Sequence, residues 1–316
     1  MGSPDTITSR YLYPKGSAQR RMFALWYFGT LITLWNVAGH TVLGFEQSWA
    51  SPVVSVASAA LATLVFEHLR ASVQGDRVRY LGSIDAFAST FIPALIPGLA
   101  VGMLLYPNER LSPLVFASFL AIVSKVIVRA PFGDGSQHIF NPSNFGITVT
   151  LLLFPSVGLA PPYHFTENVS GIAQWIMPAV LLATGLIVHG FATSRLPLCT
   201  AWIIGFLGQA FVRSWMFGIP IIVPLMPMTS AAFILFTLYM IPDPATTPIK
   251  FKWQIVFGLV VASIYGILIS MHIVFGLFIA LFLTSLLRGI MLVQNRLFVN
   301  FGYFLVNRSG NKLRIK

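Results

Sequence analysis

The chain has 316 residues, of which 56% are hydrophobic and only 9% are charged, and its mean hydropathy is +0.79. An ordinary water-soluble domain carries about 25% charged residues, so this composition excludes a water-soluble fold. The net charge of +11 does not indicate nucleic-acid binding, because the basic residues lie at the ends of apolar segments and not along one polar face. The single cysteine, Cys199, excludes an internal disulfide and a four-thiolate iron–sulfur cluster.

Apolar stretches close to the roughly 20 residues that cross a bilayer recur along the chain between charged or Pro/Gly-rich breaks. We therefore predict an all-α, polytopic protein embedded in a lipid bilayer. It has a polar cytoplasmic segment at 1–21, which is typical of a leader more than of a signal peptide, one transmembrane domain at 22–293 and a basic cytoplasmic tail at 294–316. The ten predicted spans are 22–44, 51–68, 84–106, 111–129, 141–157, 171–192, 196–215, 221–241, 253–272 and 274–293.

The basic residues predict the orientation of these spans. If both termini are cytoplasmic, only Arg110 and Arg213 of the 20 lysines and arginines fall on the outer side. This asymmetry is what the positive-inside rule requires, and it would be lost if one span in the middle were added or removed.

The ten spans divide into two halves at the loop around Pro161. Two halves with an odd number of spans lie in opposite orientations, as inverted repeats do, so we predict repeats at 22–157 and 171–293. The apolar runs 141–155 and 227–242 are bounded by prolines, which favours broken or re-entrant helices there. Tight turns at the membrane surface are the alternative.

Three phrases carry a resemblance to a known family. Residues 131–146 contain Ile-Phe-Asn-Pro before a helix that ends in Phe-Pro, and residues 243–248 read Asp-Pro-Ala-Thr-Thr-Pro. Both resemble phrases of the membrane family that contains the D subunit of the Rnf electron-transport complex and the B subunit of the sodium-pumping NADH:quinone reductase. Residues 38–50, Ala-Gly-His-Thr-Val-Leu-Gly-Phe-Glu-Gln-Ser-Trp-Ala, resemble the UnbU branch found beside enediyne biosynthesis genes.

The resemblance implies an accessory redox subunit of the bacterial cytoplasmic (inner) membrane, not a stand-alone enzyme. Such a subunit binds flavin and assists electron transfer across the bilayer beside other membrane subunits. In the complete complexes one FMN is esterified to a threonine in an outer phrase like Asp-x-x-Ser-Gly-Ala-Thr. Residues 167–173 read Glu-Asn-Val-Ser-Gly-Ile-Ala, so Ala173 replaces that threonine and offers no oxygen. The expected cofactor is therefore non-covalent FMN or riboflavin, and covalent FMN is not expected.

The loop before the fifth span is the first candidate ligand site. Asp134 and His138 lead into a helix N-terminus, whose free N–H groups suit a flavin phosphate or a polarised ring carbonyl. The alternative is that Asn141 caps the helix while Gly133 and Gly135 make the turn.

Asp243, which lies between two prolines, is the second candidate. It binds a cation, pairs with Lys125 or Arg129, or lies in water beside Lys250. We expect one pocket between the half-helices that begin near Asn141 and Pro227. Its predicted residues, with those of the loop, are Asp134, His138, Phe140, Asn141, Asn144, Thr148, Thr229, Ser230 and Asp243.

Other chemistry has little support in the sequence. Haem would need axial imidazoles from two helices. His40 and His189 fall in opposite leaflets. The pairs that share a leaflet, His68 with His189 and His40 with His272, have no further support in the sequence, so haem is not expected. Phosphate-loop, metalloprotease and serine-hydrolase motifs are absent from the sequence, and we predict no metal ligand or catalytic residue. A secondary transporter and a structural subunit of a larger membrane complex are the alternative functions.

Overall fold

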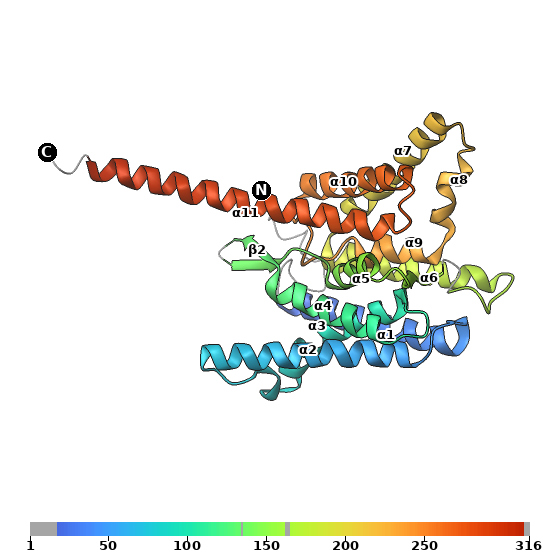
Figure 1. The fold of residues 1–316 in the computed structure, drawn as a ribbon, viewed down its shortest axis with the longest axis horizontal. Coiled ribbons are helices and arrows are strands. Elements are labelled where there is room, and N and C mark those ends of the chain that lie inside the picture. The colour runs from blue at the N-terminus through green and yellow to red at the C-terminus, as the bar shows by residue number, and fades with distance from the viewer. Residues whose placement is uncertain (1–17, 134, 162–164, 313–316) are drawn as a thin grey trace, which may run out of the picture.

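The computed structural model describes residues 18–133, 135–161 and 165–312, which are mostly helical (Figure 1). In these residues, seven helices are long and apolar enough to cross a membrane, or eight if one bent pair forms a single span. The predicted class, a multi-pass α-helical membrane protein, is therefore confirmed. Asp134 lies outside the described residues, as do most of the predicted leader and the last four residues of the tail.

The helices follow the predicted spans in chain order. Two shorter apolar helices, α4 and α5, stand where the fourth and fifth spans were expected. The helices are α1 (Ala18–Ala38), α2 (Ala50–Gln74), α3 (Ile84–Leu104), α4 (Ser112–Ile127), α5 (Pro142–Leu153), α6 (Ala173–Ile187), α7 (Leu196–Phe217), α8 (Ile222–Leu225), α9 (Ala231–Leu235), α10 (Phe251–Ser270) and α11 (Gly276–Lys312). Three segments continue helices as π-helix, η3 (Gly39–Leu43), η5 (Val188–Thr193) and η7 (Phe236–Met240), and two are 3₁₀-helices, η4 (Arg79–Leu81) and η6 (Met226–Thr229).

Local sequence explains where several helices begin and end. The hydroxyl of Ser83 accepts a hydrogen bond from the backbone N–H of Ala86 at the start of α3, and Ser230 caps α9 in the same way. Gly75 and Gly218 close α2 and α7 in the left-handed conformation, which glycine adopts without a steric penalty.

Two short antiparallel pairs of strands join the helices. β2 (Arg129–Phe132) and β3 (Gly135–His138) form a hairpin between α4 and α5, whereas β1 (Leu105–Tyr106) pairs with β4 (Gly158–Leu159). In Figure 1 the hairpin lies on the side toward which α11 projects, and α8 lies on the other side.

The eighth predicted span is broken. The axis of Ile222–Thr229 is bent by 73° from that of Ala231–Met240, and α8 runs across the other helices in Figure 1. Pro224 and Pro227 lie in the first of these two segments, where each removes a backbone N–H. The sequence prediction of a break between prolines is thus consistent with the bent helix.

The N-terminal and C-terminal halves of the chain pack as two layers. Helix α2 packs against α3 and α4, and α4 packs against α5; in the other half, α7 packs against α10 and α10 against α11. The halves meet where α5 contacts α11 and where α1 contacts η5. In Figure 1 the blue α2 and the orange α10 accordingly lie on opposite sides of the molecule.

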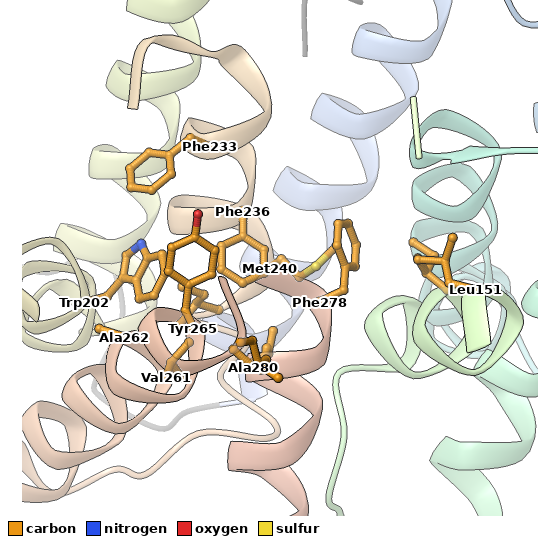
Figure 2. Close-up of a cluster of buried hydrophobic side chains, with 14 of the residues drawn as sticks. Leu151, Trp202, Phe233, Phe236, Met240, Val261, Ala262, Tyr265, Phe278 and Ala280 are labelled. Carbon is orange, nitrogen blue, oxygen red and sulfur yellow. The ribbon is translucent and has the colours of Figure 1, made fainter. Parts of the chain in front are cut away.

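The second half has an aromatic core (Figure 2). Trp202, fully buried, lies within 6.0 Å of the rings of Phe233, Phe236 and Tyr265, centroid to centroid. Its indole N–H donates to the hydroxyl of Thr237 at 2.9 Å. This hydrogen bond joins α7 to η7 and satisfies a donor that lipid and protein core would otherwise leave unpaired.

The C-terminal helix extends beyond its predicted end. We expected the last span to finish at residue 293, but α11 continues to Lys312. Arg296, just beyond the predicted span, donates to the carbonyl oxygen of Gly133 at 3.2 Å. The first turn of the predicted tail is therefore anchored to the β2–β3 hairpin.

Candidate functional site

One large cavity lies between the two halves. It has a volume of about 1610 Å³ and is lined by α1, α3, α9, η7 and the ends of α4, α5 and α11. Well-formed sites for drug-sized ligands have volumes of roughly 300–1,000 Å³, so this cavity has room for a ligand larger than these. Most of its lining is apolar, and its charged side chains gather at one end.

We call this part the charged end, defined by Lys125, Arg129, His138, Arg195 and Asp243. The other part, the apolar end, is bordered by Val223, Met226 and Val274, whose side chains are exposed. The two ends are separated by α9 and η7, ten residues that span about 15 Å if each adds a helical rise.

Arg129 is held by the hairpin at the charged end. Its Nε donates to the hydroxyl of Ser136 at 2.9 Å and its Nη1 donates to the carbonyl oxygen of Lys125 at 3.0 Å. The side chain of Lys125 is half-buried, and that of Arg129 is exposed. Lys125, which the sequence suggested as a possible partner of Asp243, also lines the cavity.

Arg195 is the charged residue that the sequence did not single out. It follows Ser194, whose φ of 56° ends η5 in the left-handed conformation, and it is only 5% exposed. Its Nη2 donates to the carbonyl oxygen of Pro244 at 3.1 Å, whereas its buried Nε has no hydrogen-bond partner within the described residues. Burial lowers the pKa of Arg195, and the carboxylate of Asp243 opposes that effect.

Asp243 forms a turn and contributes the one carboxylate of the described cavity lining. Its Oδ1 accepts from the backbone N–H of Ala245 at 2.9 Å, and its carbonyl oxygen accepts from Thr247 Oγ1 at 2.7 Å. Among the described residues no basic nitrogen lies within 4.0 Å of this carboxylate, so the ion pair with Lys125 or Arg129, one of the three alternatives for Asp243, is not formed. The carboxylate nevertheless interacts electrostatically with Lys125 and with Arg195.

His138 lies beside these charges at the end of β3. Burial lowers its pKa below the ordinary value of 6.5; the carboxylate of Asp243 opposes this shift, and Lys125 and Arg129 add to it. The imidazole is therefore mostly neutral at pH 7 and leaves the charge of the site to its neighbours.

Asn141 has the structural role that we gave as the alternative to ligand binding. Its Oδ1 accepts from the backbone N–H of Asn144 at 3.1 Å and so caps α5. Its Nδ2 donates to the carbonyl oxygen of Met240 at 3.2 Å. Gly133, with φ of 56°, lies in the turn of the β2–β3 hairpin, which precedes α5.

The structure brings some of the predicted residues to the cavity and leaves others away from it. His138, Asn141 and Asp243 line its charged end. Thr229 and Ser230 line the cavity just before α9 begins, away from the charged end. Phe140, Asn144 and Thr148 are buried in the protein and are not part of the lining. The half-helix that follows Pro227 contacts the start of α5 through Met240, at its far end.

Three of the four remaining predicted polar side chains already donate a hydrogen bond within the protein. The hydroxyls of Thr229 and Ser230 donate to Met226 and Pro227 carbonyl oxygens, at 2.7 and 2.8 Å. Asn144 donates through Nδ2 to the carbonyl oxygen of Phe278 at 3.2 Å and so joins α5 to α11. The hydroxyl of Thr148 is buried without a partner in the described residues.

Two further residues of the cavity wall, besides Arg195, were not predicted as part of a ligand site. The indole N–H of Trp35 is buried and has no hydrogen-bond partner in the described parts of the chain. His189 is completely buried, with Nδ1 2.6 Å from Thr193 Oγ1 and Nε2 2.5 Å from the carbonyl oxygen of Leu238. Both imidazole nitrogens of His189 are thus occupied by the protein, which does not suit an axial haem ligand.

Within the described residues, no group of three or more His, Cys, Asp or Glu side chains is arranged to hold a metal ion. No family model matches the chain, and no curated protein has a significantly similar sequence. The family resemblance therefore rests on the three phrases alone.

Proposed function

We propose that this chain is an accessory membrane subunit, similar to the D subunit of the Rnf complex, that assists electron transfer across the bilayer with a non-covalently bound flavin. The observation that carries the proposal is the meeting of two family-like phrases at one cavity. His138 and Asn141 come from the first phrase, Asp243 comes from the second about 100 residues later, and all three line the charged end. Residues so far apart in sequence converge in this way at ligand sites between halves of a fold.

The wall of the cavity offers groups that suit a flavin ring. The free indole N–H of Trp35 can donate to a ring carbonyl, and an unpaired buried donor gains most from such a partner. Phe28 and Tyr239 line the same cavity, with ring centroids 5.9 Å apart. Aromatic faces stack favourably on planar ligands.

The third family-like phrase packs against the loop that would carry a covalent flavin in relatives. Phe45 lies edge-on to Phe165, with ring centroids 4.9 Å apart, and the backbone N–H of Asn168 donates to the carbonyl oxygen of Leu43 at 3.3 Å. Ala173 begins α6 immediately after this loop. The loop is held in place without a nucleophilic side chain at that position, so the proposed flavin is not covalent.

The proposed architecture is ten spans in two inverted repeats, with both termini in the cytoplasm of a bacterium. Matching local features support it. Both first helices, α1 and α6, end in π-helix followed by a left-handed residue, Gly44 and Ser194. Both second helices, α2 and α7, carry a proline in the first turn and end in a left-handed glycine. The packing of α2 with α4 corresponds to that of α7 with α10.

A secondary transporter is the second candidate function. The bent eighth span borders a cavity that runs between the two halves, and broken helices at a repeat interface form the substrate sites of many carriers. A structural subunit of a larger complex is the third candidate, with the exposed apolar side chains as contacts to other membrane subunits.

A visible absorption spectrum of the protein, purified from a flavin-replete host in mild detergent, tests the proposal. We expect flavin absorbance in the blue region, and release of the flavin on denaturation. Trp35→Phe keeps the ring and removes the indole N–H, so it should lower flavin occupancy, whereas Trp175→Phe, at a residue that is 74% exposed, should not. A colourless wild-type preparation would contradict the flavin proposal and favour the transporter or the structural subunit.

A further inference from the structure

We propose that the charged end of the cavity binds the phosphate head group of an anionic lipid, a phosphate monoester of the phosphatidic acid class, whose hydrocarbon chain lies along the apolar wall. The inference goes beyond the proposed function, because it requires neither a flavin nor an electron-transfer partner. It rests on one buried cation with an unused donor, on the charge of its neighbours and on the shape of the apolar wall.

Arg195 is the first observation. A guanidinium that is 95% withdrawn from solvent, as the 5% exposure of Arg195 means, needs a hydrogen-bond partner for every donor or an opposing charge. In the described residues its Nε has none, and Asp243 is not within salt-bridge distance. A phosphate accepts several hydrogen bonds from a guanidinium fork in a fixed geometry, so it satisfies the donor that the protein leaves free.

The balance of charge is the second observation. Among the described lining residues, Lys125, Arg129 and Arg195 are cationic, and Asp243 is the one carboxylate. With His138 neutral, these groups leave a net charge of about +2 at neutral pH. A phosphate monoester carries about −1.5 to −2, so it neutralises this excess, whereas a zwitterionic head group would not.

The apolar wall is the third observation. From the charged end the lining continues with aliphatic side chains of three helices, including Ile32, Ile96 and Leu235. At the apolar end, Val223, Met226 and Val274 border the opening and are 48%, 59% and 81% exposed. An apolar lining of this kind suits a hydrocarbon chain, because burying the chain against aliphatic side chains removes apolar surface from water.

A soluble phosphate would use only half of this site. It would fill the charged end and leave the apolar wall in contact with water, which is unfavourable in proportion to the exposed area. A lipid phosphate covers both parts, and the volume of about 1610 Å³ accommodates a long chain. The proposed orientation also places the charged end at the cytoplasmic leaflet, where anionic lipids attract basic residues.

Native mass spectrometry of the detergent-purified protein with two matched probes tests the inference. The probes are 1-oleoyl lysophosphatidic acid and monooleoylglycerol, which carry the same chain and differ by the phosphate. We expect the phosphate-bearing probe to bind at least tenfold more tightly to the wild type. Arg195→Gln should remove most of that difference, while Arg296→Gln, the matched control at an exposed arginine of α11 that does not line the cavity, should preserve it.

Each outcome of this experiment decides the inference. Equal affinity of the two probes for the wild type, or an unchanged preference in a well-folded Arg195→Gln variant, would overturn it. If that variant aggregates, the double variant Lys125→Gln/Arg129→Gln replaces it, with the same expectation of a lost preference. Inorganic phosphate that binds as tightly as the lipid probe would also overturn the lipid assignment. The absorption spectrum tests the flavin separately, so a colourless protein that prefers the phosphate probe refutes only the proposed function.

Discussion

At the scale of single residues, most hydroxyls in the apolar helices bond to their own backbone. Thr33, Thr63 and Ser263 each donate to the carbonyl oxygen four residues earlier, as polar side chains commonly do in membrane helices. Thr237 differs, because its hydroxyl accepts from the indole N–H of Trp202, on another helix.

Thr237→Val tests the contribution of this hydrogen bond. The substitution keeps the shape of the side chain and leaves the indole N–H of Trp202 buried without a partner, which costs about 1–3 kcal/mol. We expect a lower midpoint for thermal unfolding in detergent. Thr237→Ser retains the acceptor and should lose less, and equal losses in the two variants would assign the effect to packing.

Ala173 gives a second prediction at this scale. It has no oxygen to form the phosphoester found in the subunits that the three phrases resemble, so denaturing gels viewed under ultraviolet light should show no fluorescent band, even with the flavin-attaching enzyme co-expressed. Ala173→Thr restores a hydroxyl and is the variant expected to gain a band. A band from the unaltered chain would mean that another residue of this loop carries the FMN, and Thr166 would be the first candidate.

The sequence predicted part of the cavity, and the reasons for the rest are physical. Phrases around Asn141 and Asp243 led to two segments that do meet. Nothing in the sequence distinguishes Arg195 from other basic residues at helix ends, because its burial depends on how the turn after η5 packs against Pro244. The packing of α5 likewise buries the predicted ligand residues Asn144 and Thr148 in the protein, away from the cavity.

At the scale of secondary structure, close helix contacts depend on small residues. Gly258 of α10 lies against α7, where an added Cβ would be 2.6 Å from the carbonyl oxygen of Leu198 and 2.8 Å from the backbone nitrogen of Trp202. Small residues let membrane helices approach in this way, and their packing supplies much of the association energy.

Gly258→Ala should therefore destabilise the protein. The intrinsic helix propensity of alanine favours the change by about 1 kcal/mol, but forcing the two backbones apart costs about 1–3 kcal/mol, and the close contacts here are with backbone atoms that cannot rotate away. The control is Gly208→Ala, also in a helix, where an added Cβ meets nothing within 4 Å. We expect thermal unfolding in detergent to shift downward for the first variant and not for the second. The same shift for both would show that the contact is unimportant.

Element positions were easier to predict than element geometry. Apolar runs and prolines located the helices to within a few residues, because lipid requires every span to satisfy its own backbone. The 73° bend at Ser230 and the extension of α11 to Lys312 depend on tertiary contacts, such as that between Arg296 and Gly133, which periodicity does not encode.

At the scale of the whole molecule, the cavity and the charge distribution depend on one topology. The charged end of the cavity collects Lys125, Arg129 and Arg195, all of which belong to loops and helix ends assigned to the cytoplasm by the positive-inside rule. The alternation of sides along the chain then requires α4 and α5, although short, to count as spans. If either were absent from the membrane, the second half would be reversed and the basic residues after it would face outward.

Reporter fusions along the chain test this topology directly. Fusions at Asp76 and Lys250 should report a cytoplasmic location, because the segments around them carry Arg77, Arg79 and Lys252 and moving each charge across the bilayer is costly. Fusions at Arg110 and Glu167 should report the outer side. Arg110 and Glu167 bracket α4 and α5. If only one of these two helices spans the membrane, Glu167 should report the cytoplasm and Lys250 the outer side, whereas if neither spans it, as in a count of eight, the four locations stay the same. A reporter at Asp76 on the outer side would defeat the orientation itself, and with it the assignment of the charged end to the cytoplasmic leaflet.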